Sequence, residues 1–455
     1  MKDMNQVSSS FRDPAGFVFV KDGTVYRQIN KEYEHDYRKL MDSGLYEALT
    51  KKKWLVCHEE VDITRDELAY KIIRPQQIPF ISYSYEWCFS QLKDAALLTL
   101  DIQELALRFG MSLKDSSSYN IQFLPKPIFI DTTSFEEYEE GSAWVGYRQF
   151  CRHFLAPLAL MSRCNIYLNK MLTSYIDGIP LDLASSLLPA RTKFNISLLS
   201  HIHLHAKSES FDGAQKPKKY KVSKLGLLGI IDNLRSCVKR MQLKKAHSSI
   251  WSDYYEKELN YSDEAFTAKK EIVAEMLKSI SSQSVVDLGA NRGIFSRVAS
   301  EMGIFTISSD IDPIAVERNY LEAKAKKRDH LLPLVVDITN PSPGIGWENE
   351  ERESFFTRAP ETTALALALI HHLVIANNLP FGKVAAFFSR VCQHLIIEFV
   401  PKSDSQVERM LRHRKDIFGF YTADNFEADF AKEFTIKRTV PVEGSNRVIY
   451  LMERK

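Results

Sequence analysis

The C-terminal part of the chain alternates short apolar runs with stretches whose apolar residues recur at helical spacing. Short apolar runs bounded by turn residues predict buried strands. They lie at residues 285–288, 305–309, 332–336, 363–370, 395–400, 434–436 and 448–452, and residues 383–392 fit a helix. Strands that alternate with helices predict an α/β fold built on a parallel sheet.

The turn after the first of these strands is rich in glycine and begins with an acid. Asp287, Gly289 and Gly293 fit the D-x-G-x-x-x-G form of the loop that opens a Rossmann-type domain. Glycine permits positive φ angles and lets the backbone approach a ligand closely. A pyrophosphate would favour the tighter G-x-G-x-x-G spacing without a nearby acid. The pattern therefore favours a ligand other than a dinucleotide.

Acids also end the next two strands. Asp310 follows the second apolar run, and Asp337 follows the third. The carboxyl ends of parallel strands share one edge of a sheet, where open α/β folds bind ligands. We therefore expect the three carboxylates to border a common site. The alternative is that each acid caps the helix after its strand.

This arrangement resembles the class I S-adenosylmethionine (SAM) methyltransferases over roughly residues 265–455. The resemblance implies a Rossmann-like seven-stranded domain with a terminal antiparallel pair, and SAM as the cofactor. It implies that Asp287 and the glycine loop hold the methionine end of SAM, Asp310 the ribose hydroxyls, and Asp337 the adenine amine. SAM suits carboxylates because its sulfonium and ammonium groups are cations. The candidate cofactor-binding residues are Asp287, Gly289, Asn291, Gly293, Asp310, Ile311, Asp337 and Ile338.

Three segments resemble one subgroup more closely. They read Val-Val-Asp-Leu-Gly-Ala-Asn from residue 285, Ala-Leu-Ala-Leu-Ile-His-His-Leu from residue 366, and Ile-Glu-Phe-Val-Pro-Lys-Ser-Asp from residue 397. These segments are similar to those of the bacterial methyltransferases related to nodulation host-specificity proteins. The similarity to these proteins extends into the N-terminal region.

The candidate catalytic residues are His371, His372 and Glu398. The histidines follow the fourth strand, where methyltransferases place residues that face the methyl group. A histidine with an ordinary pKa of ~6.5 suits proton removal near neutrality; the alternative is that one packs beneath a helix and the other lies in solvent. Glu398, which ends the fifth strand, is a second candidate for removing a proton or orienting a histidine.

The turn after the fourth strand also bears on the acceptor. Enzymes that methylate exocyclic or amide nitrogens commonly carry an Asp/Asn-Pro-Pro-aromatic turn there, whereas this chain has Ile-His-His-Leu. That difference favours an oxygen or carbon acceptor. The family resemblance suggests a hydroxyl on a glycan or another small metabolite.

The N-terminal half has a different, α+β pattern. Residues 17–29 predict a β-hairpin with an Asp-Gly turn. Asp115, Asn120 five residues later, and a strand pair that ends at Asp131 resemble the catalytic core of the kinase-like phosphotransferases. The resemblance implies that Asp115 receives the acceptor proton while Asn120 and Asp131 hold Mg²⁺.

Two departures argue against an active kinase. No glycine-rich loop precedes the hairpin, and Arg27 stands where a lysine is expected. A degenerate domain that binds substrate, or a nucleotide without turnover, is therefore favoured over an active enzyme. In the alternative interpretation Asp115 and Asn120 cap a turn, and Asp131 ends a strand.

We predict three segments along the 455 residues: an α+β recognition domain at 1–205, a linker with lid helices at 206–264, and the methyltransferase domain at 265–455. Aromatic residues between 251 and 266 would either enclose SAM or pack a helix on the sheet. His201, His203 and His205 could bind a metal, but helical packing is the favoured interpretation, and we predict no metal site.

Composition adds a few exclusions. The net charge of +2 indicates no partner, and the basic cluster at residues 239–245 is expected to be a solvated helix face rather than a nucleic-acid site. Six cysteines without a C-x-x-C pair favour a reduced, cytoplasmic chain. The longest apolar stretch is far short of the ~20 residues that cross a bilayer, so we expect no membrane anchor.

The leading hypothesis is a SAM-dependent methyltransferase with a small-molecule or glycan acceptor. A phosphotransferase fused to a SAM-binding domain is an alternative from another enzyme class. A third hypothesis is an interaction protein whose methyltransferase fold has lost activity.

Overall fold

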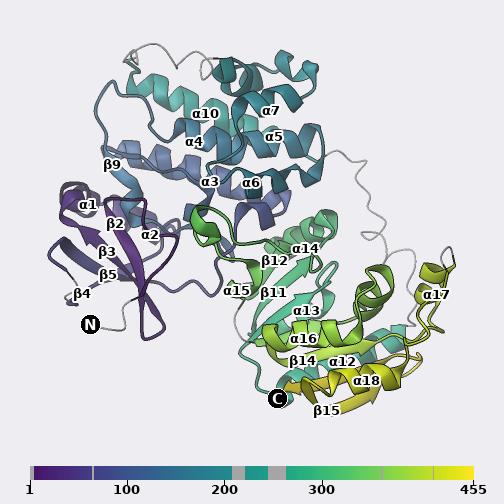
Figure 1. Ribbon diagram of the computed structural model, residues 1–455. Coiled ribbons are helices and arrows are strands. Elements are labelled where there is room, and N and C mark those ends of the chain that lie inside the picture. The colour runs from purple at the N-terminus through teal and green to yellow at the C-terminus, as the bar shows by residue number, and fades with distance from the viewer. Residues whose placement is uncertain (1–4, 64–65, 208–220, 244–262, 360–361, 413–414) are drawn as a thin grey trace. The chain divides into compact units, whose positions relative to one another are not determined.

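The computed structural model describes residues 5–63, 66–207, 221–243, 263–359, 362–412 and 415–455. The chain divides into two compact units (Figure 1). The N-terminal unit comprises Met1–Lys245 and Pro343–Glu353, and the C-terminal unit comprises Ala246–Ser342 and Ser354–Lys455. The segment between residues 343 and 353 thus belongs to the unit that precedes it by a hundred residues of sequence.

A five-stranded antiparallel sheet begins the N-terminal unit, in the order β1-β2-β3-β5-β4. The predicted hairpin is confirmed: β2 pairs with β3 around a turn in which Asp22 and Gly23 have φ angles of 50° and 73°. Helices α1 and α2 follow β3 in the chain, and Tyr37 of α1 shares a hydrophobic cluster with Ile29 of β3. The elements are β1 (Asn5–Gln6), β2 (Gly16–Lys21), β3 (Thr24–Asn30), α1 (Glu34–Asp42), α2 (Leu45–Lys51), β4 (His58–Val61) and β5 (Ala69–Pro75).

Helices make up most of the remaining N-terminal unit. Helix α3 is the longest of these helices and buries twelve residues. It packs against α10, whose Arg235 lies 3.0 Å from Asp101 and 2.5 Å from Glu104 of α3. Two short antiparallel pairs, β6 with β9 and β7 with β8, interrupt the helices. The elements are α3 (Phe89–Arg108), β6 (Met111–Leu113), β7 (Ile121–Leu124), β8 (Lys126–Phe129), β9 (Phe135–Glu137), α4 (Tyr147–Phe150), α5 (Ala156–Arg163), α6 (Met171–Ser174), α7 (Leu181–Leu187), α8 (Ile196–Leu198) and α10 (Lys224–Arg240).

A seven-stranded sheet forms the centre of the C-terminal unit, in the order β12-β11-β10-β13-β14-β16-β15. The first five strands of that order run parallel, and β16 pairs antiparallel with both β14 and β15. This confirms the predicted α/β domain with its terminal antiparallel pair. The strands are β10 (Ser284–Leu288), β11 (Phe305–Asp310), β12 (Leu331–Val335), β13 (Thr362–Ala366), β14 (Cys392–Phe399), β15 (Phe434–Pro441) and β16 (Val448–Arg454).

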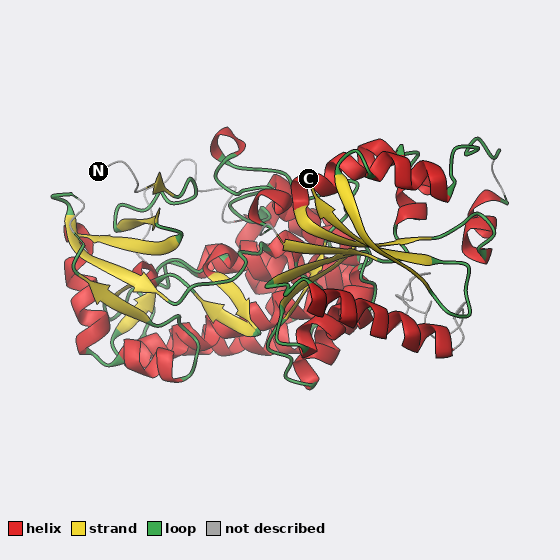
Figure 2. Ribbon diagram, turned by 90° about the horizontal axis from the view of Figure 1, so that it is seen from below, coloured by secondary structure: helices red, strands yellow, loops and turns green. Residues whose placement is uncertain are grey.

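Helices cover both faces of this sheet (Figure 2). On one face, Val273 and Met276 of α12 pack against Val285 and Leu365 of the strands. On the other, aromatic rings stack around Phe426, whose centroid lies 5.2 Å from Phe399. The helices are α12 (Asp263–Ser279), α13 (Ile294–Glu301), α14 (Pro313–Ala325), α15 (Phe355–Arg358), α16 (Phe381–Val391), α17 (Ser405–Leu411) and α18 (Ala423–Phe430). No helix among the described residues is long and apolar enough to cross a bilayer.

The fourth predicted strand is shorter than its apolar run. Strand β13 ends at Ala366, and Ala368 has a φ of 51°, which turns the chain out of the sheet. His371 therefore lies five residues beyond the strand, at the start of a π-helical turn, His372–Ala376. The difference arises because alanine carries no turn signal, so its left-handed conformation could not be read from the sequence.

Candidate functional site

The glycine loop is fixed to the neighbouring strand by its backbone. Leu288 is the register partner of Ser309, and Asp310 is that of Val335, so the ends of β10, β11 and β12 share one edge of the sheet. The amides of Gly289 and Ala290 both donate to the Ser309 carbonyl at 2.9 Å. These hydrogen bonds to the sheet thus fix the conformation of the loop where it begins.

Both predicted glycines have positive φ angles, 78° at Gly289 and 70° at Gly293. Space also demands a glycine at the second position, since a Cβ on Gly293 would lie 2.3 Å from Asn319 Nδ2. Asn319 itself is held by Ser308 Oγ, to which it donates at 2.8 Å. The close approach of loop and helix α14 therefore depends on Gly293.

Asp287 is almost completely buried at the end of β10. Ser296, in the first turn of α13, donates its hydroxyl to Asp287 Oδ2 at 2.6 Å. Burial raises the pKa of Asp287 to about 7; the bond from Ser296 opposes this rise, and the negative charge of Asp310 adds to it. Asp287 does not cap helix α13, whose N-cap is Gly293, and the charge of Lys269 offsets its raised pKa only in part.

Asp310 is buried at the end of the adjacent strand. Its carboxylate accepts the amides of Asn291 at 2.7 Å and Asp312 at 2.8 Å, so it joins the glycine loop to β11. Burial raises the pKa of Asp310 to about 6 despite these bonds. Asp312, rather than Asp310, caps helix α14 by accepting the Ile314 amide at 2.9 Å.

Asp337 lies two residues beyond Val335, at the same edge of the sheet. Its Oδ1 accepts the amide of Thr339 at 2.8 Å and the hydroxyl of Thr339 at 2.6 Å, which closes a local turn. Ile311 is 53% exposed beside Asp310, and Ile338 is half-buried. The structure therefore brings Asp287 and Asp310 into electrostatic contact. Asp337 is placed at the same edge of the sheet because its strand, β12, pairs with β11.

The two histidines differ from the expectation of an ordinary pKa. Burial lowers the pKa of His371 well below the usual value, and the positive charges of His372 and Arg447 lower it further. Burial likewise lowers the pKa of His372 to about 4. Their rings lie 4.3 Å apart, and His371 Nδ1 is buried without a hydrogen-bond partner among the described residues. Both imidazoles are therefore neutral near pH 7.

Glu398 is completely buried and bonded to cations. Its Oε2 accepts Lys269 Nζ at 2.6 Å and the Ala368 amide at 2.6 Å. Its Oε1 lies 3.6 Å from Arg447, which also pairs with Asp404 at 2.8 Å. Glu398 therefore holds the left-handed turn that leads to the histidines.

Lys269 is a residue of this centre that sequence reasoning did not assign to it. Burial lowers the pKa of Lys269, and its pair with Glu398 opposes this shift. The available signal was a lysine in the apolar stripe of α12, in register with Ile272, Val273 and Met276. A lysine on a buried helical face requires an acidic partner.

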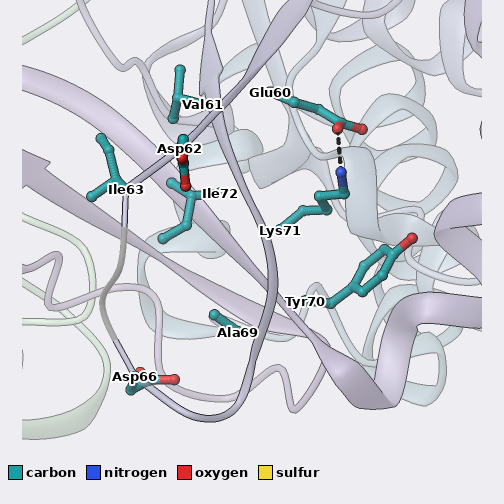
Figure 3. A pocket seen from close by; sticks show the side chains of 9 residues that line it. All are labelled: Glu60, Val61, Asp62, Ile63, Asp66, Ala69, Tyr70, Lys71 and Ile72. Carbon is teal, nitrogen blue, oxygen red and sulfur yellow. Dashed lines mark hydrogen bonds and ion pairs between the residues drawn. The ribbon is translucent and has the colours of Figure 1, made fainter.

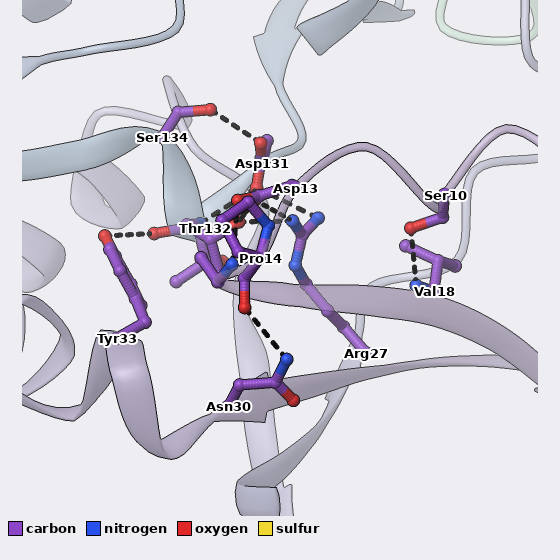
Figure 4. A network of polar contacts seen from close by, with 12 residues as sticks. Ser10, Asp13, Pro14, Val18, Arg27, Asn30, Tyr33, Asp131, Thr132 and Ser134 are labelled. Atoms are coloured by element: carbon purple, nitrogen blue, oxygen red, sulfur yellow. Dashed lines mark hydrogen bonds and ion pairs between the residues drawn. The ribbon is translucent and has the colours of Figure 1, made fainter. Parts of the chain in front are cut away.

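Of the N-terminal candidates, Asp131 pairs with an arginine (Figure 4). Arg27 Nη1 lies 2.9 Å from Asp131 Oδ1. Burial would raise the pKa of Asp131, but Arg27 and hydrogen bonds from Ser134 and Thr133 more than offset it, so the pKa is lowered. Burial raises the pKa of Asp115, and the charge of Asp131 raises it further. The aspartate caps its own turn by accepting the Ser117 amide at 2.9 Å, as the capping interpretation proposed.

The alternating histidines of the N-terminal unit have protein partners. His201 bonds Tyr147 and Asn233, at 2.7 and 3.0 Å, and His203 bonds Ser185 at 2.7 Å. Over the ranges that the structure describes, no group of three or more His, Cys, Asp or Glu side chains could hold a metal ion. Packing thus accounts for His201 and His203.

A pocket of about 500 Å³ opens on the β4–β5 hairpin (Figure 3). It is lined partly by Glu60 and Lys71, which form an ion pair at 2.6 Å, and by Asp66. None of the predicted site residues lines it. Of the predicted aromatic lid, residues 251–262 lie outside the described residues, whereas Phe266 packs on Phe295 at 5.7 Å.

Comparison with known proteins gives one long match and several structural likenesses. The nodulation protein NoeA of Rhizobium meliloti (strain 1021) is 33% identical over 468 residues, which cover 99% of this chain and 96% of NoeA. This relative confirms the resemblance to nodulation proteins that the motifs indicated, and it extends the resemblance through the N-terminal half. No family model matches the chain.

The solved structures match over a smaller part. The bifunctional kinase-methyltransferase WbdD is 16% identical, covering 42% of this chain and 40% of its own, with a TM-score of 0.31. Magnesium protoporphyrin IX methyltransferase from Synechocystis PCC 6803 is 16% identical, covering 42% of this chain and 84% of its own, with a TM-score of 0.30. The N-methyltransferase NodS from Bradyrhizobium japonicum WM9 is 12% identical, covering 42% of this chain and 98% of its own, with a TM-score of 0.31. These scores are too low to support an inference about this chain, but the NoeA match spans both units: the chain belongs to the NoeA family of nodulation proteins.

Proposed function

We propose that the C-terminal unit binds SAM at the edge formed by β10, β11 and β12, and that the protein is a SAM-dependent methyltransferase. The observation that carries this proposal is a pair of buried acids that form no ion pair and whose pKa values are raised, although the charge of Lys269 lowers that of Asp287 in part. Glu398 pairs with Lys269, and Glu351 pairs with Arg12 at 2.8 Å. Asp287 and Asp310 make no ion pair with any described residue and rely on hydrogen bonds.

An uncompensated pair of buried carboxylates favours a cationic ligand. Each carries a raised pKa, so each gains free energy when a positive group approaches and its proton leaves. SAM offers two cations and a ribose diol within one molecule. Under the proposal, Asp287 and the glycine loop receive the methionine end, and Asp310 receives the ribose.

The remaining candidate residues complete the proposed site. Asp337, at the end of β12, would accept the adenine amine, and Ile311 and Ile338 would flank the base. When bound, SAM supplies an electrophilic methyl group on its sulfonium, so the protein chiefly has to align an acceptor. Alignment of this kind can contribute ~7–11 kcal/mol to a displacement.

The acceptor proposed is an oxygen, on a glycan or a small metabolite, with carbon as the alternative. The turn after β13 supports this choice, because it presents His371 and His372 rather than a polar proline-rich turn. Both imidazoles are neutral, so either can accept a hydrogen bond from a hydroxyl without first losing a proton. Glu398 would act on them indirectly, by holding the Ala368 turn.

Calorimetry with SAM tests the site. Asp310→Ala should abolish SAM binding, whereas Asp329→Ala, at an exposed acid of the same unit, should leave it unchanged. Unaltered affinity in Asp310→Ala would contradict the ribose assignment. Incubation of cell extract with the protein and isotopically labelled SAM, followed by mass spectrometry, would then identify the acceptor. Absence of both S-adenosylhomocysteine and any labelled product in every extract would contradict methyl transfer.

A further inference from the structure

The N-terminal unit contains the residues that a kinase-like centre would use to hold Mg²⁺, namely Asn120 and Asp131. Mg²⁺ demands near-octahedral coordination by oxygen at about 2.0–2.1 Å. The surroundings of these two side chains therefore decide whether the metal fits. Both residues and their hydrogen-bond partners lie within the described residues, and Figure 4 shows Asp131 with Arg27, Asp13 and Ser134.

Both carboxylate oxygens of Asp131 already have partners. Oδ1 accepts the Thr133 amide at 2.8 Å, lies 2.9 Å from the Thr133 hydroxyl and 2.9 Å from Arg27 Nη1. Oδ2 accepts the Ser134 hydroxyl at 2.6 Å. Oδ1 is thus fully occupied, and a metal ion that approached Oδ2 would bind a carboxylate that already pairs with the Arg27 guanidinium.

Arg27 faces a second acid as well. Its Nη2 lies 3.5 Å from Asp13 Oδ2 and also bonds the Thr133 hydroxyl. The Thr133 hydroxyl lies 3.0 Å from Asp13 Oδ2, so its single proton bonds one of the two carboxylates at a time. The guanidinium, whose side chain is 12% exposed, thus sits between two acids, as a cation shared by carboxylates would.

Asn120 is held by hydrogen bonds to its neighbours. Its Nδ2 donates to Ser134 Oγ at 3.2 Å, the same hydroxyl donates to Asp131, and the Asn120 side chain also bonds Asp115. The amide oxygen of Asn120 is of the type that Mg²⁺ accepts, so the obstacle to the metal is the cation already at Asp131. With Arg27 in place, the residues present therefore do not fit the metal that the kinase resemblance implies.

We infer that Arg27 is the resident counter-ion of Asp131 and takes the place of a metal, so that this cluster does not bind a Mg²⁺–nucleotide complex. The positive charge comes from β3, and the two acids come from the segment before β2 and the segment after β8. The cluster consequently joins three parts of the unit through one buried ion pair. The C-terminal site plays no part in this argument, so the two proposals fail separately.

The first test uses the native full-length protein. Titration with ATP in millimolar Mg²⁺ should give no binding heat and no change in melting temperature that depends on the metal. Binding that requires Mg²⁺ and is lost in Asp131→Asn would overturn the inference. The expected result of this arm is measured on the native protein alone.

The second test removes the counter-ion. Arg27→Met should lower the melting temperature, because it leaves Asp131 and Asp13 without a cation, and millimolar Mg²⁺ should restore part of the loss. Arg74→Met is the matched control: Arg74 lies on β5, is 47% exposed and pairs with Glu59, so its loss and any metal effect should be small. An Arg27→Met protein as stable as the native one, or one indifferent to Mg²⁺, would contradict the exchange of guanidinium for metal.

Discussion

Acidification should weaken SAM binding, because the proposed site must lose protons to receive a cation. Asp287 and Asp310 have pKa values of about 7 and about 6 in the free protein. At pH 5.5 both are mostly protonated and neutral, and at pH 7.5 both are mostly ionised. A ligand that binds only the ionised pair is therefore opposed by protons throughout this interval.

The size of the effect follows from the two pKa values. Between pH 7.5 and 5.5, protonation of Asp287 lowers the affinity ~25-fold and protonation of Asp310 lowers it ~4-fold, if the two titrate independently. Together they amount to ~100-fold, or about 2.7 kcal/mol. At pH 6.5 the free pair holds about one proton in total, so about one proton should leave with each SAM bound.

Calorimetry in two buffers of different ionisation enthalpy measures both quantities. The range should end at pH 7.5, because an α-amino group such as that of SAM begins to titrate near ~7.7–8.0. Asp287→Asn should reduce the pH dependence to the ~4-fold that Asp310 contributes. Asp329→Asn should retain the full dependence. A constant affinity from pH 5.5 to 7.5 in the native protein, with no proton released, would refute the reasoning.

Two further outcomes concern the turn after β13. Lys269→Met should lower the free energy of unfolding by ~3–5 kcal/mol, since it removes the nearer of the two cations that face the buried carboxylate of Glu398. The double variant with Glu398→Gln should recover part of that loss. Urea titration followed by tryptophan fluorescence and far-UV circular dichroism checks this, and equal stability of single and double variants would count against the pair. In methyl transfer, His372→Asn should lower kcat more than it lowers the affinity for SAM. The pH profile of the native kcat should show no histidine inflection near pH 6.5, because the pKa of His372 is about 4. Loss of SAM affinity with an unchanged kcat would argue against a role of His372 at the acceptor.

Much of the C-terminal fold could be predicted, because each of its strands is encoded locally. The apolar runs correspond to β10 to β16, and the glycine positions follow from the turn they make. The predicted β13 was too long, because nothing in the sequence marks Ala368 as left-handed. The roles of the candidate cofactor and catalytic residues remain predictions, which the geometry supports to different degrees.

The rest of the site depends on contacts between distant residues. Lys269 and Glu398 are 129 positions apart, and neither residue alone indicates the other. Arg27 could be recognised as a departure from the kinase pattern, but its pairing with Asp131 required the fold. The pKa values of His371 and His372 depend on burial and on Arg447, which the sequence places 75 positions beyond His372.

The contrast between the two kinds of buried acid bears on function. An acid whose folded pKa exceeds its unfolded value of about 3.8 holds more protons when folded, so its contribution to stability falls as pH rises through that interval. For Asp287, raised to about 7, the loss corresponds to ~4 kcal/mol by pH 7. Asp131 behaves in the opposite way, because Arg27 lowers its pKa. Its contribution to stability is therefore gained as the pH rises above that lowered pKa. A fold selected for stability alone would have paired Asp287 as it pairs Asp131. That the chain pairs one and leaves the other uncompensated, beside a glycine loop, is the expected arrangement if the missing cation arrives with a ligand.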